Sequence, residues 1–229
     1  TTQRRMIWLM LAVAWTLRIG AVFAVQYYLE HVVHPPRQFV IEGDAEGYWQ
    51  LARHLVEGQP YQIYTPPRAV LRMPGFPAIL AASIHLFGDS LLAARLVLAT
   101  IGALGCLGVY LLGVRLVSPR IGLIAGWLAA LSPIFVGFSA IELTETAFAV
   151  AMVFGLIPMI RPPACSSGLG GITESTRAVL FRGLMAGALT AVGVYLRPSW
   201  LLFPPLLAGW LWLFRETNCS TTTSEQRPR

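Results

Sequence analysis

Long apolar runs are the feature that most constrains how this chain can fold. Met6–Tyr28 is a run of about 23 mostly apolar residues, and as a helix it would extend about 34 Å, enough to cross a bilayer. The later apolar runs are Leu91–Val117, Ile121–Phe138, Thr146–Ile160, Val179–Leu196 and Ser199–Phe214. Only 12% of the 229 residues are charged, against roughly 25% in soluble proteins. The sequence therefore predicts an integral membrane protein of the all-α class, a polytopic transmembrane bundle of about six spans.

The basic residues favour a membrane topology signal over a nucleic-acid partner. All 17 are arginine, and the net charge is +6. The absence of lysine from the sequence excludes Schiff-base chemistry and a P-loop lysine. Because the arginines are scattered between apolar runs, they match the positive-inside pattern, and we expect no nucleic acid to bind. The three cysteines have no metal-like spacing, and no disulfide framework is expected.

The topology depends on Phe76–Phe87, an apolar segment of about twelve residues that is too short for an ordinary span. If it crossed the membrane, Arg115 and Arg120 would fall outside. If it lies in the interface or re-enters, Arg115, Arg120 and six further arginines fall inside, in agreement with the positive-inside rule. These inner arginines are Arg4, Arg5, Arg115, Arg120, Arg161, Arg177, Arg182 and Arg215. We therefore predict an inner (cell) membrane protein with both termini cytoplasmic.

This topology gives a simple domain organisation. Residues 1–214 form a transmembrane module, within which 29–90 is an extracytoplasmic loop that carries short interfacial helices. Ala45–Glu57 has the pattern of a short amphipathic helix ended by Gly58 and Pro60. Residues 215–229 are polar and are expected to form a disordered cytoplasmic tail.

The outer loop carries two carboxylates, Asp44 and Glu46, at the start of that amphipathic helix. Two acids with one residue between them can share a divalent cation such as Mg²⁺ or Mn²⁺, or one can act as a base beside the other. The alternative is structural, with Asp44 as the N-cap and Glu46 as a first-turn acid.

Several arginines at the predicted outer ends of the spans have two interpretations each. Arg72, in the rigid turn Arg72–Pro77, can hold a phosphate by a bidentate fork or can serve as a snorkelling interfacial anchor. Arg197, which precedes Pro198, and Arg95 can each bind an anionic headgroup or cap a helix C-terminus.

A second acidic segment joins two apolar runs. Glu142 and Glu145 are three residues apart, so a helix would place them on one side. Acids at the end of an apolar span are costly unless they are solvated or used. Since the topology places Asp44 and Glu145 on the same outer face, we expect them to share one water-accessible cavity there.

Two features inside the apolar runs concern packing. Arg18 lies about halfway along the first run, where a charge is expensive, so it should face the bundle interior with an acidic or carbonyl partner. The Gly122/Gly126 and Gly183/Gly187 pairs have the GxxxG spacing that lets helices pack closely.

Taken in order, these segments resemble the GT-C membrane glycosyltransferases, in the branch of the protein O-mannosyltransferases and the bacterial lipid A aminoarabinose transferases. Arg72-Met73-Pro74-Gly75-Phe76-Pro77 looks like that family's Arg-Pro-Pro-Gly-Tyr-Pro turn. The other matching segments are the Arg18-containing first run, Asp44–Tyr48, Gly88–Leu96, Leu131–Thr146 and Leu196–Pro198. The resemblance covers about residues 6–214, and family members are usually much longer.

The resemblance implies transfer of a sugar from a polyprenyl-phosphate donor on the extracytoplasmic face. The acceptor would be a lipid, a glycan or a protein. By resemblance, Asp44 would be the catalytic base or its metal-linked equivalent, and Glu145 the second acidic site residue. Arg72 and Arg197 would hold the donor phosphate, with Glu46 and Tyr48 as further substrate contacts.

Two other functions remain open at this point. One is a non-catalytic membrane subunit or lipid-carrier binder that keeps the fold. The other is a small transporter, which should carry acids or broken spans near the membrane midplane. The acids of this sequence lie at span ends and in the outer loop instead, which argues against transport.

Overall fold

The computed structural model describes residues 2–63, 66, 72–160 and 176–213, and these residues form helices and connecting segments without strands. The predicted all-α class is confirmed. The helices, with η marking π- and 3₁₀-helical turns, are α1 (Thr2–Tyr27), η1 (Tyr28–Val32), α2 (Asp44–Glu57), α3 (Gly75–Phe87), α4 (Leu91–Leu116), α5 (Pro119–Leu131), α6 (Pro133–Phe138), α7 (Thr144–Leu156), η2 (Ile157–Met159), α8 (Thr176–Leu196), η3 (Pro198–Leu202) and α9 (Phe203–Leu213). The predicted tail 215–229 lies outside the described residues, as do Arg161, Cys165 and Cys219.

Three of the described helices are long and apolar enough to cross a membrane: Thr2–Val32, Leu91–Leu116 and Thr176–Leu196. Gly75–Phe87, Pro119–Leu131 and Thr144–Met159 are shorter apolar helices. The chain is therefore a helical membrane protein, while the number of about six crossings stays a prediction.

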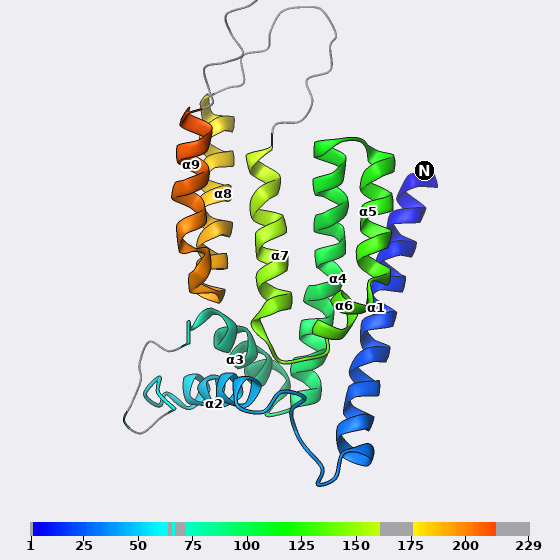
Figure 1. Cartoon of the computed structure of the whole chain (residues 1–229), viewed down its shortest axis with the longest axis vertical. Helices are drawn as coiled ribbons and strands as arrows, with labels where there is room; N and C mark the ends of the chain where they lie inside the picture. Colours follow the sequence, from blue (N-terminus) through cyan, green and yellow to red (C-terminus); the bar gives the residue numbers. More distant parts are fainter. Residues whose placement is uncertain (1, 64–65, 67–71, 161–175, 214–229) are drawn as a thin grey trace, which may run out of the picture.

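The long helices run side by side, and α4 contacts α1, α5 and α7, while α8 packs on α7. Helices α2 and α3 lie at one end of this bundle, the end where α1 finishes and α4 begins (Figure 1). Since α3 starts and ends there, it does not cross the bundle, as its length predicted. The start of α1, the α4–α5 turn and the start of α8 lie at the opposite end (Figure 1). That end carries Arg4, Arg5, Arg115, Arg120 and Arg177.

The run Ile121–Phe138 was expected as one segment, but the structure divides it at Ser132. Pro133 lacks an N–H and disfavours a helical conformation for the residue before it. Ser132 is accordingly extended, with φ −63° and ψ 119°, and α6 restarts with Pro133 in its first turn.

Arg18 uses the carbonyls that this break leaves free. Its guanidinium donates to Ala129 O at 3.3 Å and Ala130 O at 3.4 Å in the last turn of α5. It also donates to Ala14 O at 2.9 Å and Ser139 Oγ at 3.2 Å. Arg18 is buried, so the expectation of an inward-facing arginine with carbonyl partners is confirmed. The negative end of the α5 dipole further offsets its charge.

The two GxxxG pairs differ. A Cβ on Gly122 would lie 2.6 Å from Tyr110 O and one on Gly126 2.5 Å from Met10 Sδ, so this pair permits close packing of α5 on α4 and α1. Around Gly183 and Gly187 nothing described lies within 4 Å, so that pair makes no such contact in the described part of the chain.

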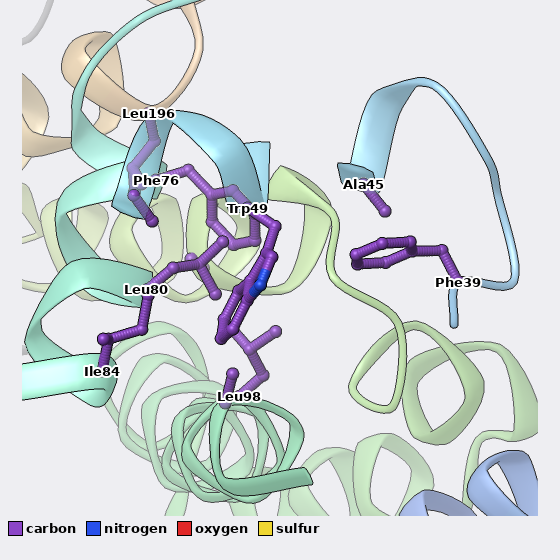
Figure 2. Packing of buried hydrophobic residues seen from close by; sticks show 11 residues of the cluster. Phe39, Ala45, Trp49, Phe76, Leu80, Ile84, Leu98 and Leu196 are labelled. Atoms are coloured by element: carbon purple, nitrogen blue, oxygen red, sulfur yellow. The ribbon is translucent and has the colours of Figure 1, made fainter. Parts of the chain in front are cut away.

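An apolar cluster fixes the α2–α3 layer to the bundle. Figure 2 shows Trp49 of α2 between Phe76 and Leu98, which come from α3 and α4, and Phe39 against Ala45. Leu196, the last residue of α8, joins the same cluster. Burying large aromatic side chains contributes about 1.5–3 kcal/mol each, so this cluster holds the start of α2 in a defined place.

Candidate active site at the α2 end of the bundle

Asp44 is the first residue of α2, and it does not cap the helix. The N-cap is Gly43, whose φ of 86° suits glycine and which has no side chain to cap the helix. The alternative interpretation of Asp44 as an N-cap is therefore wrong. Ala45 is buried in the apolar cluster, whereas the Asp44 side chain is 69% exposed. Asp44 thus stands on a fixed backbone with a carboxylate that solutes can reach.

Arg72 reaches across to the start of α2 and binds it at several points. Its Nη2 lies 2.8 Å from Asp44 Oδ1 and donates to Gly43 O at 3.1 Å, while Nη1 donates to Asp44 O. The guanidinium also lies over the Tyr48 ring, 4.5 Å from its centroid. The Arg72 side chain is only 9% exposed, so most of its donors face the protein.

Gly47 makes room for this guanidinium. A Cβ on Gly47 would lie 2.9 Å from Arg72 Cζ and 3.0 Å from Nη1. The backbone of Arg72 is held as well, because Tyr61 donates its hydroxyl to Arg72 O at 3.0 Å. Burial raises the pKa of Tyr61 to about 12, so this donor keeps its proton at neutral pH.

Glu145 lies in the first turn of α7 and faces Arg197, which follows the last residue of α8. Arg197 Nη2 is 3.5 Å from Glu145 Oε1, a longer contact than that of Arg72 with Asp44. The Arg197 guanidinium lies 5.8 Å from the Phe148 ring centroid and its side chain is 45% exposed. Glu145 Oε2 is buried and has no hydrogen-bond partner among the described residues.

Glu142 and Glu145 do not share a helix face, contrary to expectation, because α7 begins at Thr144 and Glu142 lies in the preceding turn. Glu142 is completely buried and pairs with Arg95, with Nε 2.6 Å from Oε1. Burial raises the pKa of Glu142, and the charge of Arg95 opposes that rise. Both earlier interpretations of Arg95, headgroup ligand and helix cap, are wrong, because its side chain is buried against this carboxylate.

A cavity of about 330 Å³ opens beside the second pair and extends into the bundle. Glu145, Arg197 and Arg18 are its charged lining residues. The remainder of the wall is mostly apolar and comes from α4, α6 and α7, with Gly102, Gly105, Phe135, Phe148 and Val153 among its members. The cavity therefore combines one acid and two arginines with a mostly apolar wall.

Tyr48 packs edge-on against Phe76 and beneath the Arg72 guanidinium of the first pair. Burial raises its pKa, Asp44 and Glu145 add to the rise, and Arg72 and Arg197 oppose it, so all four charges act on one hydroxyl. Asp44 does not line the cavity, however. The expectation that both acids line one cavity is wrong in that form: Glu145 lines this cavity and Asp44 does not, although both lie at the α2 end of the bundle.

The proposed metal ligands are not arranged as a pair. Glu46 accepts a hydrogen bond from Gln50 Nε2 at 3.1 Å, while Asp44 faces Arg72. Residues two apart on a helix point to different sides, which disfavours a shared cation. The described residues contain no group of three or more His, Cys, Asp or Glu side chains that could hold a metal ion. A divalent cation at Asp44 and Glu46 stays a prediction.

Comparison with protein families identifies the chain. The model of the dolichyl-phosphate-mannose-protein mannosyltransferases matches residues 69–224. The chain belongs to this family. It is therefore a membrane glycosyltransferase of the mannosyltransferase type, in the GT-C superfamily that the sequence motifs resemble. Comparison with curated proteins and with solved structures gives no match.

The match covers Arg72, Glu145 and Arg197, whereas Asp44, Glu46 and Tyr48 precede it. Sequence analysis did not find the Arg95–Glu142 pair or the role of Gly47. The signal for the pair was present, since an arginine inside an apolar span needs a buried partner and Glu142 stands at the end of another apolar run.

Proposed function

We propose that the chain transfers a sugar from a polyprenyl-phosphate donor to an acceptor hydroxyl at the α2 end of the bundle, which faces outside. The observation that carries this proposal is the cavity. It has Glu145 and Arg197 at the α2 end and a mostly apolar wall farther in, where Arg18 is already hydrogen-bonded to backbone carbonyls. This combination fits the phosphate and the hydrocarbon chain of one lipid donor.

The proposed roles follow from the contacts. Asp44 accepts the proton of the acceptor hydroxyl as that oxygen attacks the anomeric carbon. The bond between that carbon and the phosphate oxygen breaks, and Arg197 offsets the charge that develops on the leaving phosphate. Glu145 holds Arg197, and the protonated Tyr48 hydroxyl donates a hydrogen bond to substrate.

Arg72 and Arg197 were both expected to bind the donor phosphate, and the contacts favour Arg197. The Arg72 donors bind Gly43 and Asp44 and its side chain is largely buried, whereas Arg197 is exposed at the cavity. We therefore assign Arg72 to holding Asp44 in place.

The test is transfer from labelled polyprenyl-phosphate sugars, mannose first because of the family, in membranes that contain the chain. We expect label to move into a lipid, glycan or protein fraction. EDTA decides whether a divalent cation takes part. Binding of the donor without transfer of its sugar would favour a non-catalytic lipid-carrier protein instead.

Transport is disfavoured because α1, α4, α5, α8 and α9 carry no acidic residue.

The sidedness is tested separately by cysteine labelling in intact cells, in a background without the native cysteines. Gln38 lies in the segment between α1 and α2 and Ser118 in the α4–α5 turn, at opposite ends of the bundle (Figure 1). Gln38→Cys should react with an impermeant reagent and Ser118→Cys should not. The reverse pattern would place the proposed site in the cytoplasm.

A further inference from the structure

The buried Arg95–Glu142 pair takes no part in the proposed chemistry. It nevertheless connects α4 with the chain segment that precedes Asp44 and with the segment that precedes Glu145. Arg95 lies in the first turns of α4, with Nε 2.6 Å from Glu142 Oε1. Its Nη2 donates to Gln38 O at 2.6 Å, and its Nη1 donates to Gln26 Oε1 near the end of α1.

Each partner is close in sequence to a site residue. Gln38 lies in the segment that leads to Asp44, six residues later, and Glu142 precedes Glu145 by three residues. Gln38 and Glu142 both lie in non-helical connecting segments, because α2 begins at Asp44 and α7 begins at Thr144. One guanidinium thus ties both connecting segments to α4.

A buried pair of this kind is a poor source of stability, because desolvating two charges offsets much of their attraction. Both side chains are at most 1% exposed, so neither can touch a substrate. The two hydrogen bonds to Gln26 and Gln38, together with the ion pair to Glu142, do fix geometry, because the planar guanidinium holds its partners in set directions.

We propose that Arg95 and Glu142 are positioning residues that set the placement of the Asp44 segment relative to the Glu145 segment. This inference rests on the proposed function for its kinetic consequence only. The geometric consequence can be measured whether or not the chain transfers sugar.

The test compares two double variants in purified protein. In R95M/E142M, two apolar side chains replace the buried pair, so no unpaired charge is left inside. R53M/D89M is the matched control, because Arg53 and Asp89 form an exposed ion pair at the same end of the bundle. Spin labels at Ile41→Cys and Phe138→Cys, both exposed positions close to the two segments, report the distance between them. Phe138 also lines the cavity, so turnover is measured in variants without these labels.

We expect R95M/E142M to keep a thermal midpoint within a few degrees of the parent and to broaden the 41–138 distance distribution. The kcat of R95M/E142M should fall about tenfold or more, while its donor KM should stay within about threefold of the parent's. Misplaced catalytic groups lower kcat more than they weaken donor binding. The control should match the parent in all three measurements.

If R95M/E142M does not fold, Arg95→Lys replaces it, because lysine can remain paired with Glu142 but lacks the fork that reaches Gln26 and Gln38 together. It should broaden the same distance distribution. An unchanged distribution or turnover within twofold of the parent would overturn the inference. If the parent shows no transfer at all, the proposed function fails, and the distance measurement alone decides the inference.

Discussion

The two acid–arginine pairs at the α2 end of the bundle, Asp44–Arg72 and Glu145–Arg197, are built differently. In the first pair the arginine is buried, stacks on Tyr48 and binds two backbone carbonyls, while the acid is exposed. In the second pair the arginine is exposed at a cavity, and one oxygen of the acid is buried without a hydrogen-bond partner in the described part of the chain. The same two residue types therefore expose the carboxylate to solvent in the first pair and the cation in the second.

This difference assigns separate tasks to the pairs. A base must meet the acceptor hydroxyl, so an exposed carboxylate on a fixed backbone suits Asp44. An arginine that binds the donor phosphate must be able to release its own carboxylate partner. The Arg197–Glu145 contact, at 3.5 Å, is longer than the 2.8 Å Arg72–Asp44 contact, so Arg197 is the better suited of the two arginines. The predictions below act on one pair at a time.

The largest effect is expected at the exposed carboxylate. Asp44→Asn keeps the shape and an acceptor for Arg72, but an amide cannot take a proton at neutral pH. Transfer should fall by about 10²–10⁴, the usual loss for a general base. Glu57→Gln, at the other end of α2, is the control and should retain full rate. A fully active Asp44→Asn protein would remove Asp44 from the chemistry.

A smaller effect is expected from disturbing Arg72 without changing any charge. In Gly47→Ala the new methyl group would meet the guanidinium at about 2.9 Å and push it from its place over Tyr48. Turnover should fall about tenfold, less than the ~10²-fold that a 1 Å misplacement can cause.

Stability separates this effect from misfolding. Alanine in a helix is favoured over glycine by up to about 1 kcal/mol, which offsets part of the cost of displacing Arg72, so the thermal midpoint of Gly47→Ala should stay within a few degrees of the parent. Gly183→Ala, where nothing described lies within 4 Å, should keep the parent's turnover. Equal turnover in both alanine variants would show that the placement of Arg72 does not matter.

The smallest effect concerns pH and the Tyr61 bond to Arg72. The pKa of Tyr61 is about 12 in the folded protein, above the ordinary value of 10, so the unfolded chain releases the proton first. The stability from this group is complete below pH 10 and is lost as the pH rises towards 12. Thermal midpoints in detergent between pH 9 and about 11.5 should fall less steeply for Tyr61→Phe than for the parent.

The absence of lysine simplifies this titration, because arginine stays charged and tyrosine and cysteine are the side chains that titrate in that range. Identical slopes for the parent and Tyr61→Phe would show that the bond to Arg72 does not respond to pH.

Much of the fold followed from the sequence because hydropathy and arginine placement are strong signals in membrane proteins. They predicted the helical class, the short α2 with its end at Gly58, and an α3 that does not cross the bundle. The division at Ser132 could also have been predicted, since Ser132–Pro133 has the known effect of proline on the preceding residue.

The site was predicted less completely, because contacts between distant segments leave little local signal. Asp44, Arg72, Glu145 and Arg197 were expected at one end, and the structure brings them there. The burial of the Arg72 side chain depends on packing by Tyr48 and Gly47, which the sequence does not specify. The separation of Glu142 from Glu145 depends on α7 starting at Thr144, and a shift of two residues would have reversed the conclusion.

The most direct test of the contrast between the two pairs is the donor dependence of transfer in Arg72→Gln and Arg197→Gln. If Arg197 binds the phosphate and Arg72 holds Asp44, Arg197→Gln should raise the donor KM about tenfold or more. Arg72→Gln should lower kcat by a similar factor and leave the donor KM within about threefold. A donor KM that rises as much in Arg72→Gln as in Arg197→Gln would contradict this account and return Arg72 to the phosphate site.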